Sequence, residues 1–198
     1  MAPPVPSRSD PMRTSDADLL FVPGLGGSGP EHWQTRWERK LSTGRRVEQA
    51  DWDRPSLAEW TRRIAEEVAR SSEAGRPVVL ITHSLGSLAA VHAAPLLAGL
   101  NVAGAYLIAA PSDAVVASLS EIDPAFVPTP MARLPFASVL VASRNDPYAP
   151  FTESQAKAEA WGSAFVDAGE AGHINMESGH GPWPEGLMRL AAFLKTLG

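Results

Sequence analysis

The chain has 198 residues, of which 44% are hydrophobic and 20% charged, and it contains no cysteine. A chain of this length can bury a stable core unaided, and the lack of cysteine excludes a thiol nucleophile, disulfides and cysteine-ligated metal centres. The net charge of −5 argues against nucleic acid as the main partner.

The first 16 residues are rich in proline, serine and charged side chains. We expect residues 1–16 to form a disordered arm and residues 17–198 to form a single domain. The arm lacks the apolar core of a secretory signal, and no stretch approaches the roughly 18 apolar residues that a membrane span requires. The sequence therefore predicts a cytoplasmic location and no membrane partner.

Short apolar runs alternate with segments of helical period, which is the pattern of a parallel α/β sheet. We expect six strands, at residues 19–22, 46–50, 78–82, 102–109, 138–142 and 164–167. The run at 78–82 is apolar on both faces, as a central parallel strand covered by helices would be.

Helix signals lie between these runs. The expected helix starts are Ser28-Gly29-Pro30, Ser56 with Glu59, Thr152 with Gln155, and Pro184. Two of these pairs have the spacing of a capping box, and proline favours the first helical position. Residues 111–135 are proline-rich and weakly periodic, so we expect loop and short helix there rather than a second domain.

The most apolar strand leads into Thr82-His83-Ser84-Leu85-Gly86, followed by small, helix-forming residues. Serine at a tight strand-to-helix turn is typical of a nucleophile elbow, although Thr82 stands where glycine is usual. The N–H groups at the start of the following helix would stabilise an oxyanion. The alternative is that Ser84 only caps that helix.

The first strand runs into a glycine-rich loop, Pro23 to Gly29. A P-loop is excluded because no Lys-Ser or Lys-Thr pair follows the glycines. A dinucleotide site fits Gly24-x-Gly26-x-x-Gly29 together with Asp51, so a nucleotide-dependent enzyme is an alternative. In a hydrolase the same loop would provide an oxyanion-binding N–H from Leu25, beside that of Leu85.

A serine nucleophile needs a base, and the base needs an acid that orients it. The strand at 138–142 is followed by Asp146, and the strand at 164–167 is followed by His173. The order serine, acid, histidine at three strand ends is that of the α/β-hydrolase fold. Asp113, which also follows a strand, is the alternative acid, and Asp51 and Asp53 are expected to anchor a loop.

The remaining polar candidates have simpler explanations. His173, Glu177 and His180 have the spacing of a metal-binding helix face, but the glycines around them argue against a helix there. We therefore expect no metal and no cofactor. Four aromatic residues are candidates to line an open site: Trp52, Phe126, Phe151 and Trp183.

Four motifs together resemble the α/β-hydrolase superfamily, and most closely the small lidless serine hydrolases related to retinoblastoma-binding protein 9. They are Val22-Pro-Gly-Leu-Gly-Gly27, His83-Ser-Leu-Gly86, Arg144-Asn-Asp-Pro-Tyr148 and Gly172-His-Ile-Asn175. The resemblance extends from Leu19 to the C-terminus.

The resemblance implies a minimal α/β-hydrolase sheet of about six strands, with helices on both faces and no cap domain. It also implies that Ser84 is the nucleophile, His173 the base and Asp146 the orienting acid, with the N–H groups of Leu25 and Leu85 forming the oxyanion hole. We expect a serine hydrolase that cleaves an ester, amide or thioester of a small molecule through an acyl-enzyme. The alternative is a catalytically idle fold that serves as a protein-binding module.

Overall fold

Six parallel strands form one sheet in the order β2-β1-β3-β4-β5-β6. The structure is a computed structural model, and it describes residues 11–197. The strands are β1 (Asp18–Val22), β2 (Gly44–Arg46), β3 (Val78–His83), β4 (Val102–Ile108), β5 (Ala137–Ala142) and β6 (Ala164–Asp167). The α-helices are α1 (Trp33–Lys40), α2 (Leu57–Glu73), α3 (Leu85–Ala93), α4 (Asp113–Ser118), α5 (Phe151–Trp161) and α6 (Pro184–Leu194). The short 3-10 helices are η1 (Thr14–Asp16), η2 (Ala94–Leu97) and η3 (Pro124–Phe126). The predicted α/β fold is confirmed.

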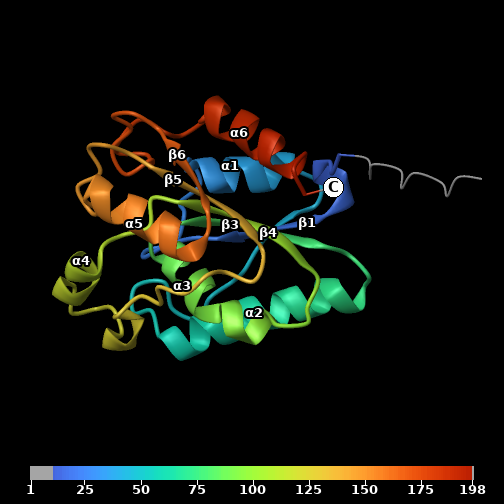
Figure 1. The fold of residues 1–198 in the computed structure, drawn as a ribbon, viewed down its shortest axis with the longest axis horizontal. Coiled ribbons are helices and arrows are strands. Elements are labelled where there is room, and N and C mark those ends of the chain that lie inside the picture. The colour runs from blue at the N-terminus through green and yellow to red at the C-terminus, as the bar shows by residue number, and fades with distance from the viewer. Residues whose placement is uncertain (1–10, 198) are drawn as a thin grey trace, which may run out of the picture.

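Helices cover both faces of the sheet (Figure 1). On one face, α1 and α6 pack against alternate strand residues such as Leu19 and Phe21. On the other face, α2, α3 and α5 pack against their neighbours Leu20 and Val22. Because successive strand residues point to opposite faces, each strand contributes to two apolar cores. The central strand β3 is buried along its whole length, as its sequence predicts.

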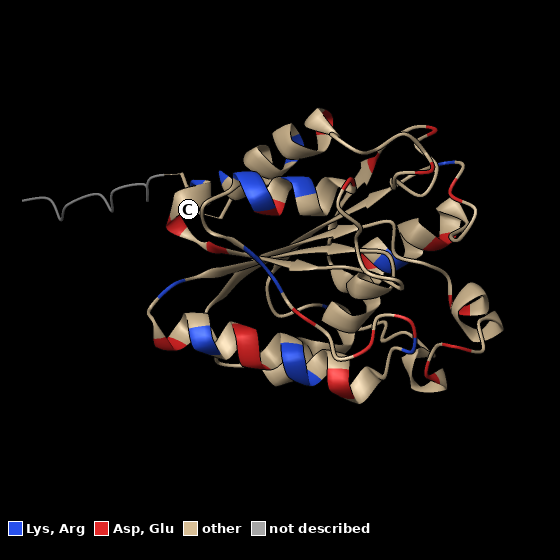
Figure 2. Ribbon diagram, turned by 180° about the vertical axis from the view of Figure 1, so that it is seen from behind, with Lys and Arg blue, Asp and Glu red and all other residues tan. Residues whose placement is uncertain are grey.

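Charged residues lie mainly on the outer surfaces of the helices and in the loops (Figure 2). Acidic and basic side chains alternate along α2, where Arg62 forms ion pairs with Glu59 and Glu66. The segment between β4 and β5 contains only α4 and η3, so no cap domain is inserted there within residues 11–197. None of the helices in this part of the chain is long and apolar enough to span a membrane.

The second strand lies earlier than predicted, at Gly44–Arg46 rather than 46–50. The N–H of Val47 donates the last hydrogen bond to the sheet, to the Phe21 carbonyl at 2.9 Å, and the chain then leaves it. Arg45 and Arg46 are held by ion pairs with carboxylates of neighbouring elements. An edge strand stabilised by ion pairs need not alternate apolar and polar residues, so its sequence gives no signal from which its position could be predicted.

Both predicted capping boxes are wrong. Ser56 makes no side-chain cap to α2; the Leu57 N–H instead donates to Asp123 Oδ2 at 3.0 Å, from 66 residues along the chain. Helix α5 begins at Phe151, so Thr152 lies inside its first turn. The predicted start at Pro184 is confirmed.

Residues 1–10 of the expected disordered arm lie outside the described residues. In the remainder of the arm, η1 is docked on the domain: the Thr43 hydroxyl donates to the Thr14 carbonyl at 2.6 Å, and Arg76 donates to the Ser15 carbonyl at 3.2 Å. Residues 14–16 of the expected arm thus form a short 3-10 helix in contact with the domain, while the expectation of disorder stays a prediction.

Candidate active site

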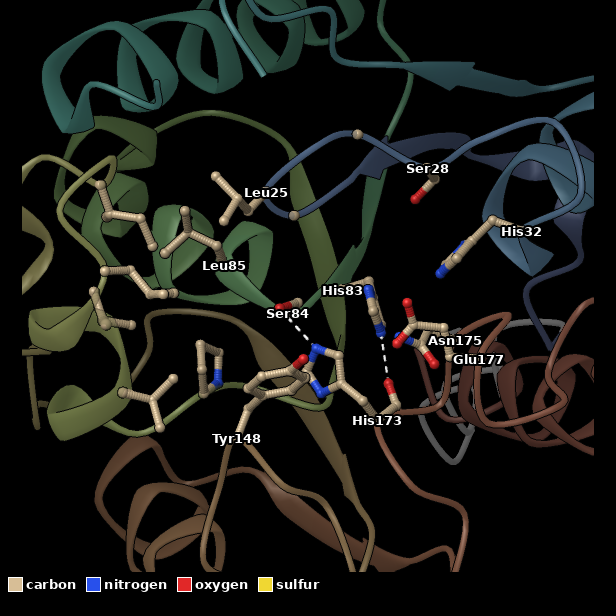
Figure 3. A pocket seen from close by; sticks show the side chains of 17 residues that line it. Leu25, Ser28, His32, His83, Ser84, Leu85, Tyr148, His173, Asn175 and Glu177 are labelled. Carbon is tan, nitrogen blue, oxygen red and sulfur yellow. Dashed lines mark hydrogen bonds between the residues drawn. The ribbon is translucent and has the colours of Figure 1, made fainter. Parts of the chain in front are cut away.

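Ser84 lies at the turn between β3 and α3 with φ 54° and ψ −128°. This left-handed conformation is strained for any residue with a side chain. The Ser84 hydroxyl caps no N–H of α3 among the described residues; its Oγ lies 2.9 Å from Nε2 of His173 (Figure 3). The geometry is therefore that of a tight strand-to-helix elbow that presents the hydroxyl to the His173 ring, and not that of a helix cap.

Close backbone packing builds this elbow. A Cβ on Gly86 would lie 2.3 Å from the Val22 carbonyl oxygen, and one on Gly24 would lie 2.8 Å from the Ser84 Cβ. Both positions therefore require glycine for close approach. Thr82, which replaces the usual glycine, is fully buried, and its hydroxyl lies 2.7 Å from the Ser87 hydroxyl. That hydrogen bond satisfies the extra polar group.

His173 and Asp146 form the rest of the predicted constellation. Nδ1 of His173 lies 3.0 Å from both carboxylate oxygens of Asp146, and the two side chains are 9% and 2% exposed. The Tyr148 N–H also donates to Asp146 Oδ1 at 2.9 Å. In the neutral ring, Nδ1–H donates to Asp146 and leaves Nε2 to accept the Ser84 hydroxyl proton.

Side chains that the sequence analysis missed connect the loops bearing Asp146 and His173. The carboxamide oxygen of Asn145 accepts the Gly172 N–H at 2.7 Å and the Ser143 hydroxyl at 2.8 Å. Ser143 Oγ in turn accepts the Ala171 N–H at 2.9 Å. The signal was present in the sequence, because Ser143 and Asn145 directly precede the predicted acid, but their partners are 27 or 28 residues away.

His83, which directly precedes Ser84, connects the elbow to the loop that carries His173. Its Nε2–H donates to the backbone carbonyl of His173 at 2.9 Å, and the rings of His83 and His173 are 4.9 Å apart (Figure 3). Burial, reinforced by the charges of His173 and His32, holds the pKa of His83 well below its usual value. His83 is therefore a neutral residue that fixes the His173 backbone.

The predicted oxyanion donors lie in adjoining segments. A Cβ on Gly24 would lie 3.2 Å from the Leu85 nitrogen, so the loop that carries Leu25 packs directly against the start of α3. Within residues 11–197, the N–H groups of Leu25 and Leu85 have no hydrogen-bond acceptor. Both donors are therefore available to a developing oxyanion.

The alternative acid, Asp113, is engaged elsewhere: its carboxylate accepts the N–H of Thr129 at 3.0 Å as well as the Thr129 hydroxyl. Asp51 accepts the N–H groups of Asp53 and Arg54, both at 2.9 Å, and so anchors its loop as predicted. The segment from His173 through Glu177 to His180 consists of turns, as its glycines predict, and forms no helical ligand face.

A cavity of about 330 Å³ adjoins Ser84 and has both apolar and polar lining residues, which we group here as an apolar wall and a polar wall. The apolar wall consists of Leu25, Leu85, Pro111, Val115, Val116, Leu119 and Ile122. The polar wall consists of Ser28, His32, His83, Asn175 and Glu177. Figure 3 shows Ser84 between the labelled members of the two walls. None of the four aromatic residues that the sequence suggested lines this cavity; Phe126 and Trp183, for example, lie in the two cores.

Comparisons with known proteins identify the family of this chain. The family model described as serine hydrolase matches residues 19–192. A YdeN-like hydrolase of Pectobacterium atrosepticum is 37% identical, with 93% of this chain and 94% of that chain covered and a TM-score of 0.79. No curated protein matches the chain.

Two more distant structures share the fold. The ydeN gene product of Bacillus subtilis is 18% identical, with 89% of this chain and 98% of that chain covered and a TM-score of 0.70. Esterase 2 of Thermogutta terrifontis is 15% identical, with 94% and 86% covered and a TM-score of 0.65.

Proposed function

This chain belongs to the serine hydrolase family, and on that premise we propose that Ser84, His173 and Asp146 act as nucleophile, general base and orienting acid of one catalytic triad. The observation that carries the proposal is the continuous hydrogen-bond chain from the Ser84 hydroxyl through the His173 ring to the Asp146 carboxylate. The protein is an esterase-like hydrolase, and an acyl-enzyme is the mechanism that this chain of groups supports.

In the first half-reaction, Ser84 Oγ attacks the carbonyl carbon of an ester, amide or thioester while its proton passes to Nε2 of His173. The oxyanion of the tetrahedral intermediate accepts hydrogen bonds from the N–H groups of Leu25 and Leu85. His173 then gives the proton to the departing oxygen, nitrogen or sulfur as that bond breaks. Asp146 keeps the ring in the tautomer that this transfer needs and stabilises the imidazolium that forms.

In the second half-reaction, water attacks the acyl-enzyme and gives its proton to His173. Collapse of the second tetrahedral intermediate breaks the bond to Ser84 Oγ, which recovers its proton from His173, and the carboxylic acid leaves. His173 carries out every proton transfer in this cycle, and Ser84, Asp146 and the N–H groups of Leu25 and Leu85 supply the other roles. The expectation from the sequence that the reaction needs no cofactor stays a prediction. The cytoplasmic location and the expected lack of nucleic-acid and membrane partners also stay predictions.

The test is intact-mass analysis after exposure to a fluorophosphonate, followed by peptide mapping of the adduct. Such probes phosphonylate a serine that its neighbours make nucleophilic. We expect one adduct, on Ser84, that is absent after heat denaturation and in the His173→Ala variant. A folded protein that forms no adduct would contradict the triad and favour the idle binding module.

A further inference from the structure

His32 presents an unused hydrogen-bond donor to the cavity. It is the N-cap of α1, it is only 7% exposed, and it belongs to the polar wall. Figure 3 shows its ring pointing from the start of α1 toward the cavity. A buried polar group in this place must interact with whatever fills the cavity.

The hydrogen bonding of His32 fixes which nitrogen carries the proton. Its Nδ1 accepts the backbone N–H of Gln34 at 3.2 Å, so the neutral ring bears its hydrogen on Nε2. Burial, together with the charges of Arg46 and His173, lowers the pKa of His32 to about 4, so the ring is neutral near pH 7. No acceptor for Nε2–H is found among the described residues.

The other buried donors of the polar wall are already used. The Ser28 hydroxyl donates to the Gln34 side-chain oxygen at 2.6 Å, and His83 Nε2–H donates to the His173 carbonyl at 2.9 Å. Among the buried residues of the polar wall that the structure describes, His32 is thus the one whose side-chain donor is available to a ligand. A neutral N–H of this kind favours an oxygen acceptor.

The direction of proton transfer places the two ends of a substrate. His173 must give its proton to the leaving group, so the leaving group departs on the His173 side of Ser84. The polar wall lies on that side: Asn175 and Glu177 follow His173 in the chain, and the His83 ring is 4.9 Å from the rings of both His173 and His32. The acyl group is left to face the apolar wall.

We propose that His32 is a specificity-determining residue whose Nε2–H donates to an oxygen of the leaving group. The preferred substrates are then esters that join a small apolar acyl group to a polar alcohol carrying an acceptor oxygen. This proposal rests on the proposed function, because it assigns the two ends of the substrate from the triad. It adds a residue that the triad does not contain.

The experiment compares 2-methoxyethyl butyrate with butyl butyrate, two esters that differ only in an ether oxygen where the other has a methylene group. The ratio of their kcat/KM values is measured for the wild type, His32→Phe and His32→Asn. Asparagine keeps a side-chain acceptor at the start of α1 but is too short to replace the ring N–H. The ratio within one variant is independent of how much of that variant is folded, and the intrinsic reactivity difference of the two esters cancels between variants.

We expect the preference for the methoxyethyl ester to fall about five- to tenfold in both His32 variants, as for loss of one neutral hydrogen bond. His92→Phe is the matched control, because His92 does not line the cavity and its Nε2–H donates to the Phe126 carbonyl at 2.9 Å; its ratio should equal that of the wild type. An unchanged ratio in the His32 variants would overturn the role of His32.

Fluorophosphonate labelling distinguishes this failure from failure of the proposed function. If Ser84 labels normally and the ratio is unchanged, or if neither ester is hydrolysed, the substrate assignment is wrong while the triad stands. If Ser84 does not label in the folded wild type, the triad is wrong and the proposal for His32 falls with it.

Discussion

The elbow at Ser84 and the loops that carry Asp146 and His173 together form the proposed active site, and they are held in place by different means. The elbow at Ser84 is fixed by backbone packing, in which Gly86 lies against the Val22 and Pro23 carbonyls with no room for a side chain. The loops that carry Asp146 and His173 are connected instead by side-chain hydrogen bonds, through Asn145 and its neighbour Ser143.

Because of this difference, changes at the elbow should affect mainly the stability of the fold, and changes in the loops should affect mainly catalysis. The elbow is continuous with the central strand and its cores, so a change there must disturb the whole fold. The loops that carry Asp146 and His173 lie outside the sheet, where a lost hydrogen bond moves these proposed catalytic groups without opening a core. The elbow should therefore be sensitive in unfolding experiments, and the loops should be sensitive in kinetic ones.

The largest effect is expected on the kinetic side, from Asp146→Asn. Asparagine has the same shape, but its amide would donate to Nδ1 of His173 and favour the tautomer in which Nε2 carries the hydrogen. Nε2 could then no longer accept the Ser84 proton, and kcat/KM for an activated ester should fall about 10⁴-fold. The free energy of unfolding should change little, as measured by urea denaturation.

Asp113→Asn is the matched control for this prediction, because Asp113 also follows a strand but is bonded to Thr129. Its kcat/KM should stay within a few-fold of the wild type. If Asp113→Asn is impaired more than Asp146→Asn, the acid has been misidentified.

On the elbow side, Gly86→Ala should destabilise the protein. The added Cβ would lie 2.3 and 2.4 Å from two backbone carbonyl oxygens, which cannot move without disturbing β1. We expect a loss of about 3 kcal/mol in the free energy of unfolding, at the upper end for an overpacked site. Urea denaturation measures it, and Gly29→Ala, which meets nothing within 4 Å, should change stability by under about 0.5 kcal/mol.

Acid should weaken the connection between the two halves, because His83 and its neighbour His32 are both buried in the neutral state. The pKa of His32 is about 4 in the folded protein, lowered first by burial and then by Arg46, against about 6.5 when unfolded. Between these values the unfolded state binds more protons, so stability falls as the pH falls. His32 alone should contribute a loss of at most about 3 kcal/mol between pH 6.5 and pH 4.

The measurement is the free energy of unfolding across that pH range for the wild type and for His32→Asn. The variant should lose up to about 1.4 kcal/mol less per pH unit. The carboxylate of Asp18, whose pKa is also lowered by its arginine partners, titrates below this window. Parallel curves for the two proteins would contradict the buried neutral state of His32.

The sequence predicted correctly the features that depend only on residues close together in the chain. The strand before Ser84, the glycine requirement at Gly86 and the order of Ser84, Asp146 and His173 all follow from apolar runs and the residues that end them. The cap of α2 was mispredicted because Ser56 and Glu59 have the right spacing, while the acceptor comes from Asp123 in a distant loop. A spacing rule does not include a competing partner that only the fold brings near.

The prediction of which residues line the cavity was wrong for a related reason. Aromatic residues were expected there because they are large and amphipathic, but Trp183 is needed in the core, where it stacks on Trp37 with the ring centroids 5.6 Å apart. The apolar wall is instead built from aliphatic residues around α4, in a segment whose sequence has weak periodicity. Nothing in a single sequence tells which apolar side chains a sheet will leave at its edge.

The smallest expected effect tests the loops most directly, through Asn145→Ala. Removing the carboxamide leaves the Gly172 N–H without its acceptor and takes one of two acceptors from the Ser143 hydroxyl, which keeps the Gly169 carbonyl at 3.2 Å, so the His173 loop can move away from Ser84. A displacement of this kind lowers kcat while leaving substrate binding intact, and we expect kcat to fall about tenfold with KM nearly unchanged.

Arg144→Ala is the control, because Arg144 lies in the same loop as Asn145 and pairs with Asp167 at the end of β6, but its side chain is 64% exposed. An ion pair in solvent contributes little, so its kcat should stay within about twofold of the wild type. Asn145→Asp, which keeps an acceptor for both donors, should recover part of the lost kcat if the hydrogen bonds matter. Equal losses in Asn145→Ala and Arg144→Ala would mean that the loops are held by their general packing, and the contrast between a packed elbow and hydrogen-bonded loops would then be wrong.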